Sequence, residues 1–439
     1  MGEIILVRQS GCQPVEKHFR IAHSHPVVSL ASAPSRGSGA GPRLPAYRCI
    51  VLACIALLGG GASLAHAADG DVFTPYVGYG IYHDDNLSRQ PENGNVQGDT
   101  WHRSTFGFRI DKTISLQHLT ADLSINETRF DRFKQFNNDG RRGSVNWGWA
   151  IGDHLDGNIG ASVIRDLTPF GERDLGTTNS LAPNIRTQHR TYIEGGWRFH
   201  PSWRLHGSYN HYDISYDGDA FANLNLDIGE VGINYLSHAQ NKIGFLLRHS
   251  DGKYPNSIGD FSGDYTQDEA KLNASWQVTG KTDLEFLGGW ARRHYKSSAE
   301  RIADYTGPDA RLTATWAATG KTSLSLAVYR ELGNGLGSFA TDDFSNYSHN
   351  KGASLDARWQ ATSKILVDAT VMREDRDYNG IIVSSENRSD VYRRNTIGVT
   401  FLPFRQLSIR ASVYQQNLDS NVGTTYRTKG FQLTARYEF

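Results

Sequence analysis

The last strand of the chain alternates between apolar and polar side chains up to the terminal aromatic residue. The apolar members are Phe431, Leu433, Ala435, Tyr437 and Phe439, and the polar members between them are Gln432, Thr434, Arg436 and Glu438. Successive side chains of a strand point to opposite faces, so one face here is apolar and the other is polar. A strand with lipid on one side and water on the other has this pattern, which is typical of transmembrane β-barrels.

Similar units recur in the second half of the chain, about 40 residues apart. They are Ala270–Leu284 (AKLNASWQVTGKTDL), Ala310–Leu324 (ARLTATWAATGKTSL) and Ser354–Leu366 (SLDARWQATSKIL), with Trp276, Trp316 and Trp359 at matching places. In each unit an alternating strand runs into a tight polar turn, and a second alternating strand follows. The repeat therefore predicts a series of β-hairpins.

Short and long connections also alternate along the chain. Short turns are expected near Asp111-Lys112-Thr113 and Thr319-Gly320-Lys321, for example, whereas Asp131–Arg141 and Gly333–His349 are long and rich in Asn, Asp, Gly and Ser. Short periplasmic turns and long outer loops characterise outer-membrane barrels. We therefore predict an all-β, antiparallel up-and-down barrel of about 18 strands, with 16 as the fallback because single-chain barrels have even numbers. A soluble β-sandwich would also alternate, but it needs no such asymmetry of loops.

The start of the chain is predicted to be an export signal. The only long apolar run is CIVLACIALLGGGASLAHA, which follows Arg43 and Arg48 and ends in an A-x-A site at Ala67. A short apolar centre with basic residues before it is the pattern of a secretory signal peptide. We assign residues 1–46 to an unstructured leader or a mis-called start, 47–67 to a signal peptide cut after Ala67, and 68–439 to an outer-membrane barrel.

Composition argues against several classes of function. The chain has 46 Lys/Arg and 46 Asp/Glu, so there is no basic footprint for nucleic acid. All three cysteines lie before residue 55, which excludes disulfides and Cys-based sites from the barrel. Histidines are scattered, and no G-x-S-x-G, H-E-x-x-H or P-loop motif is present. The runs His83-Asp84-Asp85 and His211-Tyr212-Asp213 are better explained as polar strand ends than as triads. We therefore expect no enzyme, no cofactor and no metal site.

Charged side chains at the polar positions of the strands should point into the barrel. These lumen-lining candidates are Lys271, Asp283, Glu285, Arg311, Asp356, Arg358, Asp368, Arg410, Arg436 and Glu438. Both signs of charge are present, as expected for a wet interior that would suit neutral, hydroxyl-rich solutes. The alternative is that these charges pair with one another and only fill the barrel.

The stretch from Val72 to Arg89, VFTPYVGYGIYHDDNLSR, resembles exopolysaccharide-operon outer-membrane proteins of the EpsL type, a family of β-barrel porins. The matching residues are Pro75, Asp84, Asp85, Asn86, Leu87 and Arg89, whereas Ser88 stands where an aromatic residue is common. The resemblance implies a role in making or exporting a secreted polysaccharide, together with periplasmic export components. It implies no catalytic residues.

These observations predict a non-enzymatic porin or channel of the cell outer membrane that takes part in exopolysaccharide biosynthesis and export. Its expected partners are outer-membrane lipid, a polysaccharide, periplasmic export components and the barrel assembly machinery, which would read Tyr437 and Phe439 as an assembly signal. Two alternatives stay open, namely a barrel enzyme that modifies lipid or glycan, and a structural or adhesive barrel whose loops bind partners.

Overall fold

A computed structural model describes residues 72–170, 182–239, 241–256, 263–296, 304–334, 347–379, 388–422 and 425–439. The predicted leader and signal peptide (1–67) lie outside the described residues. Within the described ranges, helix is confined to short 3₁₀ turns such as η1 (Lys134–Phe136), and none is long and apolar enough to cross a membrane.

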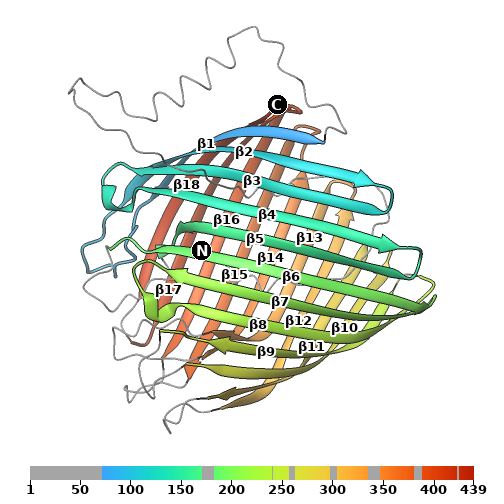
Figure 1. The fold of residues 1–439 in the computed structure, drawn as a ribbon. Helices are drawn as coiled ribbons and strands as arrows, with labels where there is room; N and C mark the ends of the chain where they lie inside the picture. Colours follow the sequence, from blue (N-terminus) through green and yellow to red (C-terminus); the bar gives the residue numbers. More distant parts are fainter. Residues whose placement is uncertain are drawn as a thin grey trace, which may run out of the picture.

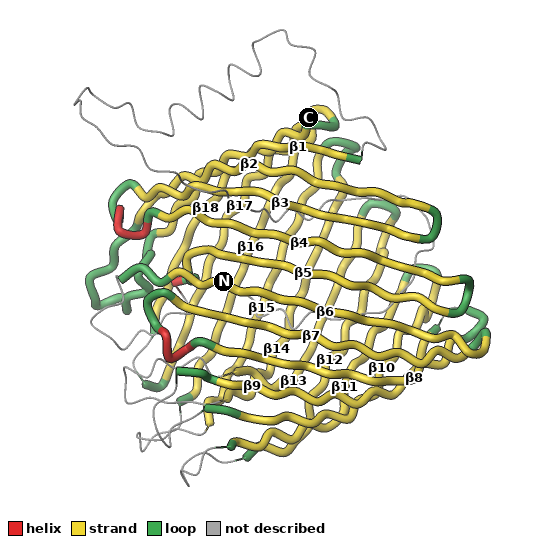
Figure 2. Tube along the Cα trace, in the orientation of Figure 1, coloured by secondary structure: helices red, strands yellow, loops and turns green. Residues whose placement is uncertain are grey.

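The described residues form one closed sheet of 18 antiparallel strands, which confirms the predicted fold class and the larger strand count (Figures 1 and 2). The strands are β1 (Phe73–Asp84), β2 (Asp99–Ile114), β3 (Gln117–Phe130), β4 (Asn138–Ile151), β5 (Leu155–Leu167), β6 (Ile185–His200), β7 (Trp203–Tyr216), β8 (Leu224–Leu236), β9 (Lys242–Lys253), β10 (Tyr265–Thr279), β11 (Thr282–Tyr295), β12 (Tyr305–Thr319), β13 (Thr322–Asn334), β14 (Tyr347–Gln360), β15 (Ile365–Asn379), β16 (Ser389–Phe404), β17 (Leu407–Ser420) and β18 (Tyr426–Glu438).

Each strand pairs with its neighbours in the sequence, and β1 also pairs with β18 to close the cylinder. The closing register runs from Tyr76 opposite Glu438 to Asp84 opposite Gly430. Closure leaves no free sheet edge, which matters because an unpaired backbone N–H or C=O costs several kcal/mol in hydrocarbon. The same register brings both ends of the barrel chain to the end that carries the short turns.

The short turns lie at one end of the barrel and the long connections at the other. Pairs such as Thr279 with Thr282, and Thr319 with Thr322, close tight turns at the positions expected from the sequence. The short turn expected near Asp111-Lys112-Thr113 lies slightly later in the chain, because β2 continues through these residues and ends at Ile114. These polar residues do not end the strand, because their backbones stay paired with β3 as far as Ile114 opposite Gln117.

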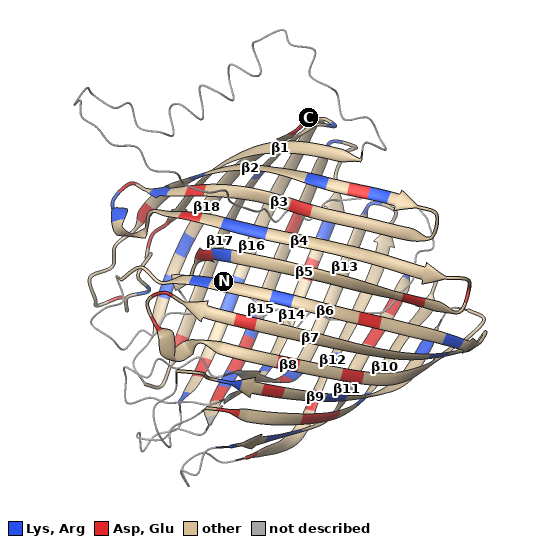
Figure 3. Cartoon of the chain, viewed as in Figure 1, with Lys and Arg blue, Asp and Glu red and all other residues tan. Residues whose placement is uncertain are grey.

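The outer surface carries the apolar members of the alternating pattern. Large hydrophobic side chains such as Phe106, Val371 and Leu433 are exposed on this surface. Tryptophans beside the short turns are exposed as well, and they are Trp147, Trp197, Trp203, Trp276, Trp316 and Trp359. Such a ring suits the boundary between lipid tails and head groups. Charged residues are nevertheless spread along the strands (Figure 3), which is possible because many of them take the inward positions.

The directions in which the side chains of β18 point can be tested directly. Leu433 is 44% exposed on the outer surface, whereas Thr434 is the next residue and points to the lumen. We expect Leu433→Arg to impair assembly, since an arginine on the lipid face near mid-membrane costs roughly 2–4 kcal/mol. Thr434→Arg should be tolerated because its side chain meets water. Heat-modifiable migration of the folded barrel in gels measures both, and equal tolerance would show that the facing is wrong.

Candidate functional site

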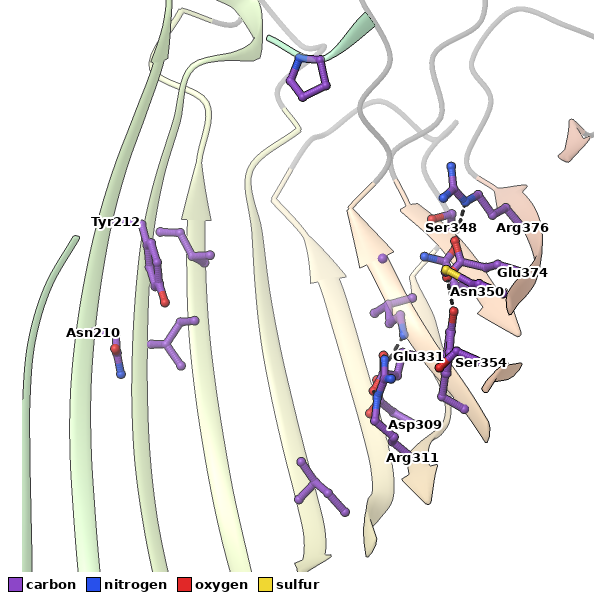
Figure 4. Close-up of a pocket in the computed structure, with 18 of the residues that line it drawn as sticks. Asn210, Tyr212, Asp309, Arg311, Glu331, Ser348, Asn350, Ser354, Glu374 and Arg376 are labelled. Atoms are coloured by element: carbon purple, nitrogen blue, oxygen red, sulfur yellow. Dashed lines mark hydrogen bonds and ion pairs between the residues drawn. The ribbon is translucent and has the colours of Figure 1, made fainter. Parts of the chain in front are cut away.

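The barrel encloses a cavity of about 1450 Å³, and every strand contributes to its lining. Fourteen Lys/Arg and ten Asp/Glu side chains contribute to this lining, together with many tyrosines and amides. The wall is therefore polar and has an excess of positive charge, although both signs are present as the alternation predicted. Figure 4 shows part of the cavity, with Asn210 and Tyr212 on one wall and a charged group around Arg311 on another.

The lumen-lining candidates fall into two groups in the structure. Lys271, Glu285 and Arg311 line the main cavity. The others lie on inward positions nearer the short turns, outside that cavity, and they are Asp283, Asp356, Arg358, Asp368, Arg410, Arg436 and Glu438. Several of these side chains contact one another rather than standing alone in the lumen.

Two contacts near the short-turn end show how these charges are used. Arg410 binds Asp368 in a bidentate ion pair, with Nη2 donating to Oδ2 at 2.7 Å. Arg436 lies over the ring of the buried Tyr76, with 3.6 Å between the guanidinium carbon and the ring centroid, and pairs with Glu438 at 2.9 Å. These groups brace β15 against β17 and β18 against β1, which is the pairing alternative raised from the sequence.

A network of ion pairs crosses β8 to β13 on the wall of the main cavity. Arg248 joins Glu230 and Glu269 at 2.8 and 3.1 Å. Lys271 continues the network to Glu269 and Asp309 at 2.5 and 2.7 Å, and only 5% of its side chain is exposed. Arg311 then pairs with Glu331 on β13, as Figure 4 shows. Each of these three cations has a carboxylate partner, so the network itself offers little free positive charge to a solute.

Tyrosines under arginines are a feature that the sequence reasoning missed. The guanidinium carbon lies 4.1 Å from the ring centroid for Arg311 over Tyr329, and 4.2 Å for Arg293 over Tyr265. The same stacking occurs at 4.3 Å for Arg190 over Tyr192. A signal was available, because residues two apart on a strand share a face, as Arg190 and Tyr192 do. The stacks of Arg311 on Tyr329 and of Arg293 on Tyr265 join different strands. They depend on the register between those strands, which no short stretch of sequence indicates.

The residues that carry the resemblance of the Val72 to Arg89 stretch lie at the seam where β1 meets β18. Asp84 is 1% exposed and pairs with Arg89 at 2.9 Å. The same carboxylate accepts hydrogen bonds from the hydroxyls of Tyr414 and Thr428, at 2.6 Å each, and from the backbone N–H of Asn86 at 2.9 Å. Burial alone would lower the pKa of Arg89, but the Asp84 carboxylate raises it above the usual value, so the guanidinium stays charged.

The rest of the motif extends this seam latch, by which we mean Asp84, Asp85, Asn86 and Arg89 with their partners on β17 and β18. Asp85 accepts from the Lys429 backbone N–H at 2.7 Å. The Asn86 amide donates to the carbonyl oxygens of Gln90 and Arg427, at 2.7 and 2.9 Å. Leu87 is 1% exposed and packs with the phenylalanines of β3 and its following loop. Pro75 lies at the other end of β1, where its carbonyl accepts from the Phe439 N–H at 2.9 Å.

The histidine runs do not form triads. His83 points outward and stacks on Phe431, whereas Asp84 points inward to Arg89. His211 likewise faces outward and contacts Asp227 at 2.8 Å, while Tyr212 lines the cavity. Among the described residues, no group of three or more His, Cys, Asp or Glu side chains could hold a metal ion.

No protein-family model and no curated protein sequence matches the chain. Among solved structures it is similar to the outer membrane protein OpdK from Pseudomonas aeruginosa, at 10% identity and a TM-score of 0.47, over 84% of this chain and 99% of that chain. OccAB3 from Acinetobacter baumannii matches at 10% identity and 0.45, over 84% and 99%. The siderophore receptor PirA from Pseudomonas aeruginosa matches at 10% and 0.40, over 83% and 80%. These distant likenesses indicate no solute or partner, and the resemblance around Asp84-Asp85-Asn86 stays a prediction.

The seam latch predicts a stability effect at Arg89. Arg89→Ala would leave the buried Asp84 carboxylate without its cation, and breaking a buried pair in this way costs about 3–5 kcal/mol. We expect the folded barrel to unfold at a lower temperature in detergent. Arg427→Ala is the matched control, because its partner Glu92 is 67% exposed and that surface pair contributes little. Equal unfolding temperatures for the two variants would contradict the latch.

Proposed function

We propose that this chain is an outer-membrane channel that takes part in the export of a secreted polysaccharide. The observation that carries the proposal is the pairing of an apolar outer surface with a wet, polar interior in one closed barrel. The outer surface suits hydrocarbon, and the cavity of about 1450 Å³ suits a hydrated solute.

The chemistry of the lining supports a hydroxyl-rich solute. Amide and hydroxyl side chains such as Asn210, Ser250, Gln267 and Asn350 line the cavity between the charged groups. These groups both donate and accept hydrogen bonds, as sugar hydroxyls do. The charged side chains of the β8 to β13 network already pair with one another, so they would not bind an ion tightly. Weak binding of this kind lets a solute pass through the barrel instead of being retained there.

The link to polysaccharide export rests on the resemblance of the Val72 to Arg89 stretch. On this proposal the periplasmic export components meet the short-turn end of the barrel, where both ends of the chain lie. Tyr437 and Phe439 are the residues that the assembly machinery would recognise, and their rings pack against each other at 5.1 Å. Outer-membrane lipid surrounds the apolar surface.

A reconstituted barrel should conduct ions in a planar lipid bilayer, and the strain's own secreted polysaccharide should block the current. In cells, deletion of the gene should reduce the polysaccharide released to the medium. Reintroducing the chain with Thr434→Arg, which adds bulk and charge to the lumen, should restore less export than the unchanged chain at equal barrel levels. A folded barrel that conducts no current, or a deletion strain with normal export, would contradict the proposal.

A further inference from the structure

Aromatic rings form a continuous row across β1, β2 and β3 on the lumen side of the wall. Tyr82 lies directly opposite Trp101 in the sheet, and Trp101 lies opposite Phe130. The first two rings are stacked with 5.5 Å between centroids and 8° between planes, and the next two with 5.3 Å and 22°. Phe170, which follows β5, meets Phe130 edge-on at 6.4 Å. All four residues line the main cavity, so the row presents an aromatic shelf to it.

The shelf is held from behind by a small apolar core. Leu87, Phe133 and Phe136 are buried there and pack with Phe130, and Trp101 packs against the same cluster. Phe130 itself is 4% exposed, whereas Tyr82 and Trp101 keep part of their surface open to the cavity. The Tyr82 and Trp101 rings are therefore held in place before a ligand binds, so little conformational entropy is lost on binding.

Beside the shelf, two arginines share one carboxylate. Arg103 and Arg142 reach the two oxygens of Asp166 at 3.2 and 3.0 Å. Arg103 also donates through Nε to the Thr128 hydroxyl and lies 6.0 Å from the centre of the Tyr82 ring. The Nε of Arg142 is buried and has no hydrogen-bond partner in the described part of the chain. This corner thus keeps one positive charge beyond its acid, unlike the ion-pair network on β8 to β13, in which three cations meet four carboxylates.

We infer that this corner, formed by Tyr82, Trp101, Arg103 and Arg142, is a subsite for an acidic sugar residue, such as a hexuronate unit of a glycan. Because the Trp101 ring is stacked between Tyr82 and Phe130, the apolar C–H groups of a pyranose can contact the open edges of the Tyr82 and Trp101 rings rather than their faces. The carboxylate of the sugar meets the guanidinium groups, whose planar N–H donors match its geometry. The inference rests on the proposed function and narrows its solute to an anionic polysaccharide.

The test compares oligogalacturonate with a neutral maltooligosaccharide of equal length as blockers of the reconstituted channel. The acidic oligomer should half-block the current at a lower concentration than the neutral one. Arg142→Gln should raise that concentration about tenfold, in line with the loss of a charged hydrogen bond. Trp101→Leu should weaken the block by both a hexuronate and its oligomers. Asp166 keeps Arg103 as its partner in Arg142→Gln, so folding should be preserved.

Arg311→Gln is the control, because it removes one lumen cation from the ion-pair network on β8 to β13, away from the aromatic shelf. It should leave the block by oligogalacturonate nearly unchanged. A shift equal to that of Arg142→Gln would mean that total lumen charge, rather than this corner, attracts the glycan, and would overturn the subsite. Equal block by benzoate would overturn the assignment to a sugar.

Calorimetry on the same refolded barrels in detergent separates this subsite from the proposed channel. Binding of oligogalacturonate that is lost in Arg142→Gln and kept in Arg311→Gln would support the subsite even if no current flowed. In that case the channel proposal alone would fail. Absence of any binding to the folded wild-type barrel would overturn the subsite, whatever its conductance.

Discussion

The rest of the structure depends on the pairing of every backbone N–H and C=O group within the sheet. Lipid offers these groups no partner, so a membrane-crossing sheet must close on itself. Closure requires β1 and β18 to meet in register although they lie at opposite ends of the barrel chain. Once the cylinder is closed, its inner face is screened from lipid, and charged side chains can occupy it at alternate positions along the strands. The polar interior and the apolar surface are thus two results of one backbone requirement.

Inside the cylinder, charge is distributed unevenly between walls. On β8 to β13 each cation of the network contacts at least one carboxylate, and Arg248 and Lys271 contact two each. Beside β2 and β4 the ratio is reversed, because Arg103 and Arg142 share Asp166. The first arrangement stiffens a wall, whereas the second leaves donors for a ligand. A single barrel can therefore combine a largely neutral passage with a local anion-binding corner.

The sequence predicted those features that depend on one strand at a time. The facing of Leu433 and Thr434, the exposed Trp316 and the strand count follow from a period of two and from hairpin spacing, which are local signals. The partners of the lumen charges could not be predicted in the same way. Arg410 and Asp368 are 42 residues apart and meet only across two strand pairings. The role of Asp84 was hidden too, since Thr428 lies 344 residues away and reaches it only when the barrel has closed.

Because of the position of the seam latch, the stability of the first strand depends on the presence of the last two strands. Asp84 is the last residue of β1, the first strand, but the hydroxyls that donate hydrogen bonds to its carboxylate, on Tyr414 and Thr428, belong to the last two strands. A chain cut short before β18 would contain every residue of the resembling motif and most of the lumen, yet it would bury an ion pair without its full set of hydrogen bonds. The closing of the barrel therefore also completes the hydrogen bonds of Asp84. A barrel without its last strand would be destabilised twice, by the open sheet edge and by the unsatisfied carboxylate at the end of β1.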